Sequence, residues 1–317
     1  MLRVFGLFLL AGALTAISTF ASAQTDTVSP SVLGKLIDVG ARRVHIYCTG
    51  EGSPTVVVAS GGFSFDWALV QPEIAQVTRI CTYDPAGTAW SDPLPAQTTP
   101  YCAARVDELH QLLRNAGLPG PYVLVGYSIG GLVARLYAAR YPNDISGVVF
   151  VDHAFIDTPK SAESKSPPSV NAVDSPPVLL SQSPIALDME DDQNFAKLPD
   201  RDQQLHRWAL SHSLRPTPEM AAECFSEVES ADQKLAPPLG RKPVAVVSTL
   251  YKSPRYAELQ KKLLTLSENS KQFIAENSSH MVIIDQPATV IRAILEVIAA
   301  ARTRTVLDST RAVQTGK

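Results

Sequence analysis

The sequence YVLVGYSIGGLVARLY, residues 122–137, decides the fold of this chain of 317 residues. It opens with an apolar run that is typical of a buried strand, and residues 131–137 at its other end have the pattern of a helix. The turn between them, residues 126–130, fits G-x-S-x-G, a strained strand-to-helix turn that exposes a serine hydroxyl at the edge of a sheet. The motif is weak evidence when taken alone. Because a strand precedes it and a helix follows, we predict that Ser128 is a nucleophile rather than part of a glycine-rich turn without chemistry.

Apolar runs and helical patterns alternate on both sides of this stretch. Helical spacing of apolar residues recurs in Val106–Leu113 and in Val290–Ile298. Strands that are apolar along their whole length and alternate with helices indicate a mostly parallel sheet buried on both faces. The predicted fold class is therefore α/β, with helices on both faces of the sheet. The predicted strands are 44–48, 55–59, 79–83, 122–126, 147–151, 244–249 and 272–275.

This alternation breaks between residues 153 and 240. Half of the residues in 159–184 are Pro or Ser, a composition that favours extended or irregular backbone, whereas 200–208 and 218–231 have helical patterns. We predict a cap or lid insertion over 153–240; the alternative is a surface excursion without such a role. The core domain then comprises 24–152 and 241–302, and the polar, aperiodic residues 303–317 form a disordered tail.

The N-terminus has the pattern of a secretory signal peptide. Arg3 is followed by an apolar run over 4–20 and by Ala21-Ser22-Ala23, which predicts cleavage near Ala23. The apolar run is short for a permanent membrane span. We therefore expect a secreted or periplasmic protein without a stable membrane span.

The cysteines and the charge narrow the possible functions further. Four cysteines, Cys48, Cys81, Cys102 and Cys224, would form two disulfides in an oxidising compartment, or else stay as four buried thiols. They contain no C-x-x-C, so a metal cluster or redox motif is not expected. A net charge of −3 offers no basic stripe for nucleic acid and no polybasic membrane patch. We expect no metal and no organic cofactor.

A serine nucleophile needs a histidine to accept its proton, and the chain contains six histidines. Only His280 follows the last predicted strand, in a loop ahead of the final helix. The chain order serine, acid, histidine places the base there. We therefore predict that His280 is the base.

The acid is harder to place than the base. A common place for it is the loop after strand 244–249, yet between Leu250 and Leu266 the only carboxylate is Glu258, in a helical pattern. Asp152, which ends the preceding strand, is the predicted acid, and its carboxylate would hold the imidazole of His280 in the correct tautomer. Asp157 and Glu258 are the alternatives, and Asp152 would otherwise be a strand-end turn former.

Acyl transfer also needs donors for a developing oxyanion. The loop Ser60-Gly61-Gly62-Phe63 is expected to supply one backbone N–H, from Gly62 or Phe63. The second N–H would come from Ile129, the residue after the predicted nucleophile. An apolar acyl or alcohol site could be lined by aromatic side chains, although core packing explains them equally well. The candidates are Trp67, Tyr127, Phe155 and Trp208.

Together these residues resemble the α/β-hydrolase superfamily over about residues 34–302. Residues 81–92 are similar to its segment D-R-x-G-x-G-x-S, with Pro85 in place of the arginine and Ala89 in place of a glycine. Residues 149–154 are similar to the L-D-P-A segment of pancreatic-type lipases, whose acid follows the same strand, and this supports Asp152. The resemblance implies an eight-stranded sheet of order 1-2-4-3-5-6-7-8, with the cap insertion after strand 6. That order makes a Cys48–Cys81 disulfide reasonable, and Cys102–Cys224 would then tie cap to core.

The resemblance also implies a class of reaction. With serine rather than aspartate at position 128, haloalkane dehalogenase and epoxide hydrolase chemistry lose their nucleophile. The expected function is that of a serine esterase that hydrolyses small-molecule esters through an acyl-serine intermediate. Lactone or amide hydrolysis by the same triad is one alternative. The other, from a different class, is a binding module without catalysis on the same fold.

Overall fold

The computed structural model describes residues 29–94, 101–154, 189–214, 218–232, 239–250 and 254–307. Contacts divide the chain into the units Met1–Ser31 and Val32–Lys317, and the helices and strands among the described residues lie in the second. The strands are β1 (Lys35–Asp38), β2 (Arg43–Thr49), β3 (Val56–Ala59), β4 (Ile80–Asp84), β5 (Tyr122–Tyr127), β6 (Ile145–Val151), β7 (Val244–Thr249) and β8 (Ser270–Ala275).

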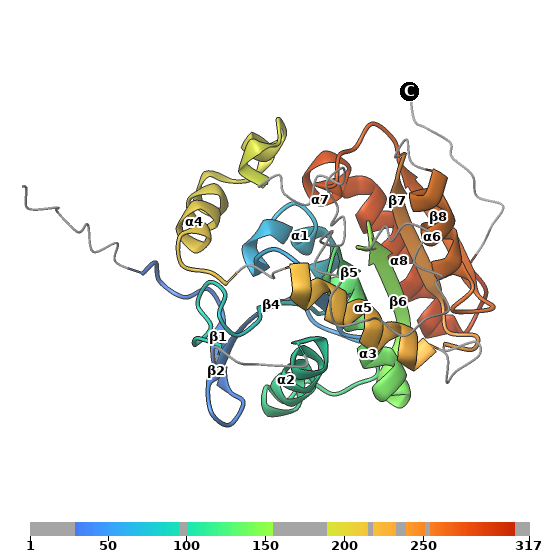
Figure 1. The fold of residues 1–317 in the computed structure, drawn as a ribbon, viewed down its shortest axis with the longest axis horizontal. Helices are drawn as coiled ribbons and strands as arrows, with labels where there is room; N and C mark the ends of the chain where they lie inside the picture. Colours follow the sequence, from blue (N-terminus) through green and yellow to red (C-terminus); the bar gives the residue numbers. More distant parts are fainter. Residues whose placement is uncertain are drawn as a thin grey trace, which may run out of the picture. The chain divides into compact units, whose positions relative to one another are not determined.

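The helices cover both faces of the sheet formed by these strands (Figure 1). The α-helices are α1 (Gln71–Ala75), α2 (Tyr101–Asn115), α3 (Gly130–Arg140), α4 (Asp200–Leu210), α5 (Pro218–Asp232), α6 (Pro254–Leu264), α7 (Val282–Asp285) and α8 (Pro287–Thr303). The short 3-10 helices are η1 (Ser64–Trp67), η2 (Pro142–Asp144), η5 (Met189–Asp191) and η6 (Phe195–Lys197).

All eight strands belong to one sheet, in the order β1-β2-β4-β3-β5-β6-β7-β8. β2 is antiparallel to β1 and to β4, and all other neighbours are parallel. The predicted fold class and strand order are confirmed. The seven strands predicted from apolar runs are present, and the pattern missed only β1, a short edge strand that is half-buried and therefore lacks a strong apolar signal.

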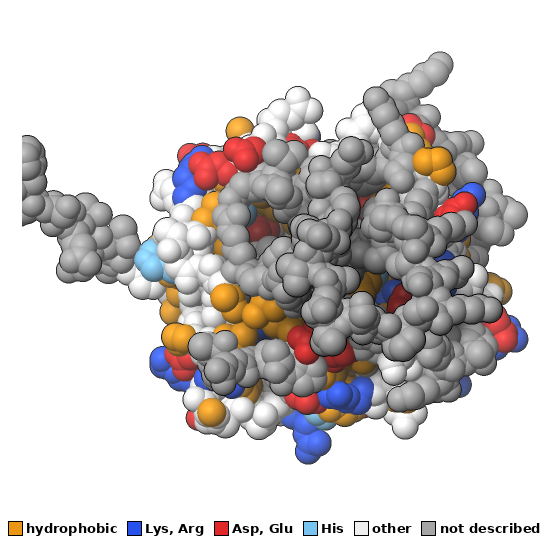
Figure 2. Space-filling model, viewed as in Figure 1, with side chains coloured by type: hydrophobic (Ala, Val, Ile, Leu, Met, Phe, Trp, Pro, Cys, Tyr) orange, Lys and Arg blue, Asp and Glu red, His pale blue; other side chains and the backbone are white. Residues whose placement is uncertain are grey.

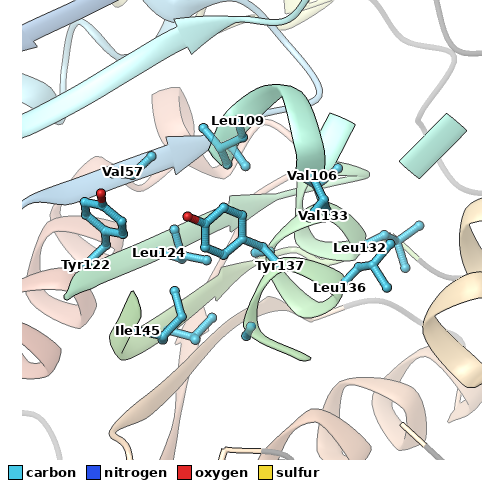
Figure 3. Close-up of a cluster of buried hydrophobic side chains, with 14 of the residues drawn as sticks. Val57, Val106, Leu109, Tyr122, Leu124, Leu132, Val133, Leu136, Tyr137 and Ile145 are labelled. Carbon is cyan, nitrogen blue, oxygen red and sulfur yellow. The ribbon is translucent and has the colours of Figure 1, made fainter. Parts of the chain in front are cut away.

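The alternation of side chains along the strands builds two core layers. In β5, Tyr122 and Leu124 face the layer covered by α2, α3, α5 and α6, whereas Val123 and Val125 face the layer covered by α1, α7 and α8. Figure 3 shows part of the first layer, where side chains of α2 and α3 pack toward strand residues Val57 and Leu124. The carboxyl ends of the central strands are thereby held between two helical layers.

Helix α4 of the predicted cap packs against η1 of the core. Phe63, Phe65 and Trp90 from the core form a buried apolar cluster with Leu205 and Ala209 of α4. Helix α5 was also placed in the cap by the sequence pattern, but its buried side chains Cys224 and Val228 belong to the core layer with α2 and α3. Of the two predicted cap helices, α5 therefore belongs to a core layer, whereas α4 packs against η1.

Two disulfides are formed, Cys48–Cys81 and Cys102–Cys224. The first joins directly paired residues on the neighbouring strands β2 and β4. The second joins α2 to α5. Both pairings are those that the resemblance implied.

The chain beyond α8 differs from the predicted disordered tail at its beginning. Leu307 is buried, and its N–H donates to Asn269 Oδ1 at 2.7 Å, so residues up to 307 are docked on the core. Residues 308–317 lie outside the described residues, as does the predicted signal peptide, 1–23. In the described part of the chain, no helix is both long and apolar enough to cross a membrane. On the face in Figure 2, acidic and basic side chains are interspersed over the described surface.

Candidate active site

Ser128 occupies the turn between β5 and α3 in a left-handed backbone conformation, with φ 55°. Such a φ is strained for a residue with a side chain and persists only where the surroundings hold it. Gly126 and Gly130 are required here, because a Cβ at Gly126 would lie 2.6 Å from Gly131 Cα and one at Gly130 would lie 2.2 Å from Ala59 O. The two glycines let α3 approach the strands closely enough to form the turn.

The imidazole of His280 connects Ser128 to Asp152. His280 Nε2 lies 3.0 Å from Ser128 Oγ, and His280 Nδ1 lies 2.5 Å from Asp152 Oδ2. The three residues are only 7%, 6% and 2% exposed for Ser128, His280 and Asp152. The structure thus brings together the predicted nucleophile, base and acid, although they are up to 152 residues apart in the chain.

Asp152 is held at the end of β6 by its backbone and by its side chain. Its φ is 39°, its N–H donates to Val247 O of β7 at 2.8 Å, and its second carboxylate oxygen, Oδ1, accepts a hydrogen bond from the Tyr256 hydroxyl of α6. Of the alternative acids, Glu258 is exposed on α6 and Asp157 lies outside the described residues. The described geometry favours Asp152.

The loop that carries His280 is fixed by Asp285 of α7. Asp285 Oδ2 accepts hydrogen bonds from Ser279 N–H at 2.7 Å, from Ser279 Oγ at 2.8 Å and from Ser278 Oγ at 3.1 Å. Burial opposes the charged form of this carboxyl, but the hydrogen bonds from Ser279 and its neighbours outweigh burial and lower the pKa of Asp285. Asn194, after η5, also donates to Asp285 Oδ1, at 2.7 Å. The charged carboxylate therefore fixes the backbone next to the base.

The aromatic residues predicted to line a substrate site have other roles where they are described. Tyr127 donates from its hydroxyl to His280 O at 2.9 Å, and its ring stacks on the imidazole with centroids 5.3 Å apart. Trp67 is 0% exposed and packs its ring edge against Tyr127. Both are buried core side chains, the alternative that the sequence left open, and of the two only Tyr127 is in direct contact with His280. Trp208 packs on Trp90, and Phe155 lies outside the described residues.

The predicted oxyanion loop lies directly beside the nucleophile. A Cβ at Gly61 would lie 3.3 Å from Ser128 Cβ, and Gly61 N–H donates to Tyr127 O at 3.2 Å. Gly62 N–H donates to Ser60 Oγ at 3.0 Å. Among the described residues, no hydrogen-bond partner is found for Ile129 N–H. Gly62 and Ile129 thus remain the candidate donors for a substrate oxygen, since the described partner of Gly62 N–H is a neutral hydroxyl.

The backbone N–H of Phe63, the other predicted donor in this loop, already donates a hydrogen bond to a side chain. Its N–H donates to Asp66 Oδ2 at 2.8 Å, and the same carboxylate accepts a hydrogen bond from His206 Nδ1 of α4 at 2.7 Å. Asp66 and His206 are 0% and 3% exposed. A buried carboxylate holds an N–H more strongly than a hydroxyl does, so the structure favours Gly62 over Phe63. The same pair ties the cap helix to the oxyanion loop.

A sequence model of the alpha/beta hydrolase fold matches residues 54–287. The chain belongs to this family. The uncharacterized protein YqjL of Bacillus subtilis is 27% identical to this alpha/beta hydrolase over 260 residues, which cover 80% of the chain and 86% of YqjL. An uncharacterized protein of Schizosaccharomyces pombe is 30% identical over 164 residues, or 42% of the chain, and the match spans only 30% of that protein.

Among solved structures, an esterase from Thermogutta terrifontis is similar, with a TM-score of 0.60 and 21% identity. The similarity covers 84% of this alpha/beta hydrolase and 97% of that chain. At this identity it shows the fold alone. Family membership supports hydrolysis as the class of reaction.

Sequence reasoning missed the residues that hold this site in place. Tyr256, Asp66, His206 and Asp285 contact Asp152, the oxyanion loop or the base loop, as described above. No motif contains them. Tyr256 and His206 lie 104 and 140 residues from their partners Asp152 and Asp66. Asp66 and Asp285 accept hydrogen bonds from nearby backbone N–H groups, but no sequence pattern sets these two carboxylates apart. Within the described ranges, no group of three or more His, Cys, Asp or Glu side chains is arranged to hold a metal ion.

Proposed function

We propose that this alpha/beta hydrolase is a serine esterase that cleaves carboxylic esters through an acyl intermediate on Ser128. One observation carries the proposal: the two nitrogens of His280 contact Ser128 Oγ and Asp152 Oδ2 at the same time. A serine hydroxyl is a weak nucleophile until an adjacent base accepts its proton, and a carboxylate behind the base fixes its tautomer and stabilises the imidazolium. The three side chains have the geometry that these roles require.

In the acylation step, Ser128 Oγ attacks the ester carbonyl carbon while His280 Nε2 takes the hydroxyl proton. The oxyanion of the tetrahedral intermediate accepts hydrogen bonds from Ile129 N–H and from Gly62 N–H, which leaves Ser60 Oγ. His280 then gives its proton to the leaving alcohol, so that the C–O bond breaks and the acyl group stays on Ser128. Water attacks the acyl group in the same way, with His280 again as base, and releases the acid and the free serine.

The substrate that we propose is a small-molecule ester. The serine at the turn fits acyl transfer in general, and the name of a structurally similar protein, an esterase, favours an ester among the possible acyl substrates. Lactones and amides would react by the same steps. A binding module without catalysis is disfavoured, because such a protein would have no need of a strained serine with φ 55° that contacts a histidine.

We further propose that the protein acts outside the cytoplasm. The two disulfides, Cys48–Cys81 and Cys102–Cys224, are typical of proteins in oxidising compartments. This agrees with the predicted signal peptide and its cleavage near Ala23. The mature protein would therefore be secreted or periplasmic.

The test is covalent labelling together with turnover. A fluorophosphonate probe should label the wild type and not Ser128→Ala, and hydrolysis of a short-chain nitrophenyl ester should be lost with the label. Ser146→Ala is the matched control, because it removes a serine hydroxyl bonded to Tyr122 O at the start of β6. Equal labelling of wild type and Ser128→Ala would remove Ser128 from its role. A labelled protein that cleaves lactones or amides but no ester would overturn the ester assignment alone.

A further inference from the structure

The carboxylate of Asp152 has a separate partner for each oxygen. Oδ2 faces His280 Nδ1 at 2.5 Å, and Oδ1 accepts a hydrogen bond from the Tyr256 hydroxyl. Asp152 is 2% exposed. An ionised carboxylate in such a place is strongly disfavoured unless donors satisfy its oxygens. Because Asp152 must stay charged to stabilise an imidazolium, the donor on Oδ1 bears directly on the chemistry.

The Tyr256 hydroxyl is fixed as a donor by its own surroundings. Thr249 N–H, at the end of β7, donates to the phenol oxygen at 3.3 Å. Tyr256 is buried, and burial together with the negative charge of Asp152 raises its pKa, so the phenol keeps its proton at neutral pH. The hydroxyl therefore accepts from the backbone of β7 and donates to Asp152. This fixes the direction of the chain of hydrogen bonds from β7 to His280.

Helix α6 contacts the end of β6 at a second point. Gln260, four residues after Tyr256 and thus on the same side of the helix, donates from Nε2 to His153 O at 3.0 Å. Gln260 is 1% exposed. One helix therefore holds both the side chain of Asp152 and the backbone directly after it. Both contacts come from the same helix, α6.

We propose that Tyr256 is a positioning residue for Asp152: its hydroxyl holds Oδ1 and thereby turns Oδ2 toward His280 Nδ1. This inference rests on the proposed function and adds a fourth side chain to it. The imidazole becomes positively charged only as the reaction proceeds, so an aligned carboxylate lowers the energy of the transition state more than that of the bound substrate. Loss of the phenol should consequently slow the chemical step without weakening substrate binding.

The test removes one hydroxyl and keeps the ring. In Tyr256→Phe, kcat and kcat/KM for a nitrophenyl ester should fall together by about tenfold to a hundredfold, the effect of one hydrogen bond to a charged group. Tyr122→Phe is the matched control, because that buried phenol donates to Leu118 O at 2.6 Å, at the other end of β5, and its turnover should equal that of the wild type. Rates are divided by the concentration of sites that react with fluorophosphonate, so that unfolded protein does not lower the measured kcat.

A double-mutant cycle then asks whether Tyr256 acts through Asp152. In an Asp152→Asn background, Tyr256→Phe should lower kcat no further, because the carboxylate that it positions is gone. Wild-type turnover in Tyr256→Phe, or a loss of the same size in both backgrounds, would overturn the inference while leaving the triad intact. Failure of the proposed function looks different: Ser128→Ala would keep its label and its turnover.

Discussion

Asp152 and Glu258 are two carboxylates with opposite surroundings. Asp152 is buried at the end of β6, where His280 and Tyr256 each contact one of its oxygens. Glu258 is exposed on α6. Water screens the charge of an exposed carboxylate and weakens its interaction with an imidazole. In a buried place the same interaction is screened much less. Both side chains are carboxylates, and only Asp152 has the buried, hydrogen-bonded surroundings that the proposed role requires.

At the scale of the residue, we predict that Asp152→Asn leaves the protein folded and lowers kcat by about 10⁴-fold, since the amide favours the wrong imidazole tautomer and carries no charge. Glu258→Gln, the same acid-to-amide change at an exposed position, should be nearly silent. Steady-state turnover of a nitrophenyl ester, with circular dichroism as the check on folding, measures both. If Asp152→Asn kept near wild-type turnover, the acid would be a carboxylate other than Asp152.

At the scale of the element, the end of β6 packs directly on the start of α3. A Cβ at Gly131 would lie 2.5 Å from the ring of His153, so the ring fills the space that this glycine leaves. His153 is buried, and burial, with a smaller effect from the charge of Arg135, lowers its pKa from 6.5 to about 3. The same ring contacts the helix that begins at the nucleophile turn. A charge on His153 would therefore disturb the packing beneath Ser128.

This packing predicts a loss of stability in acid. The folded protein keeps His153 neutral down to about pH 3, whereas the unfolded chain binds the proton below about pH 6.5, so the folded state loses up to about 1.4 kcal/mol per pH unit between these values. His153→Gln has no imidazole to titrate and so lacks this pH-dependent loss. As the pH falls, the free energy of unfolding should therefore decrease more in the wild type than in the variant. Urea unfolding at pH 7, 6 and 5 measures it. His212→Gln, the same change at an exposed histidine, is the matched control. If the unfolding free energy of His153→Gln changed with pH as that of the wild type does, His153 would not be the group that titrates.

At the scale of the whole molecule, the two disulfides constrain the chain to different extents. Cys48–Cys81 closes a loop over a separation of 33 residues within neighbouring strands. Cys102–Cys224 closes one over 122 residues, from α2 to α5, and spans the nucleophile turn and much of the insertion. A crosslink removes more conformational freedom from the unfolded chain when its loop is longer. The second disulfide therefore has the larger expected effect on folding.

We predict that replacing Cys102 and Cys224 together by Ala lowers the free energy of unfolding by about 1 kcal/mol more than replacing Cys48 and Cys81 together, from the ratio of the two loop lengths. Urea unfolding of both double variants gives the comparison. Thiol titration of denatured, unreduced wild type should find essentially no free thiol. Four free thiols would refute both disulfides, and equal destabilisation would refute the loop-length argument.

Much of the fold and part of the site could be predicted from local patterns in the chain. Strand positions followed from apolar runs, because a strand buried on both faces has few polar residues whatever its neighbours are. Ser128 followed from a glycine-bounded turn, which is a local constraint, and His280 followed from its position after the last predicted strand. The edge strand β1 was not predicted, since its exposed and half-buried residues form no continuous apolar run.

Contacts between distant segments could not be predicted in this way. That Tyr256 reaches Asp152, that His206 reaches Asp66 and that α5 joins the core layer depend on where the helices pack. A single hydroxyl or carboxylate has no periodicity, and its partner lies 104 residues away for Tyr256 and 140 for the contact of His206 with Asp66. Chain patterns encode which side chains are buried, because burial depends on each residue's own polarity. Which buried groups meet depends on packing the entire core at once, and this packing places the ring of Trp67 against Tyr127, whose own ring stacks on His280.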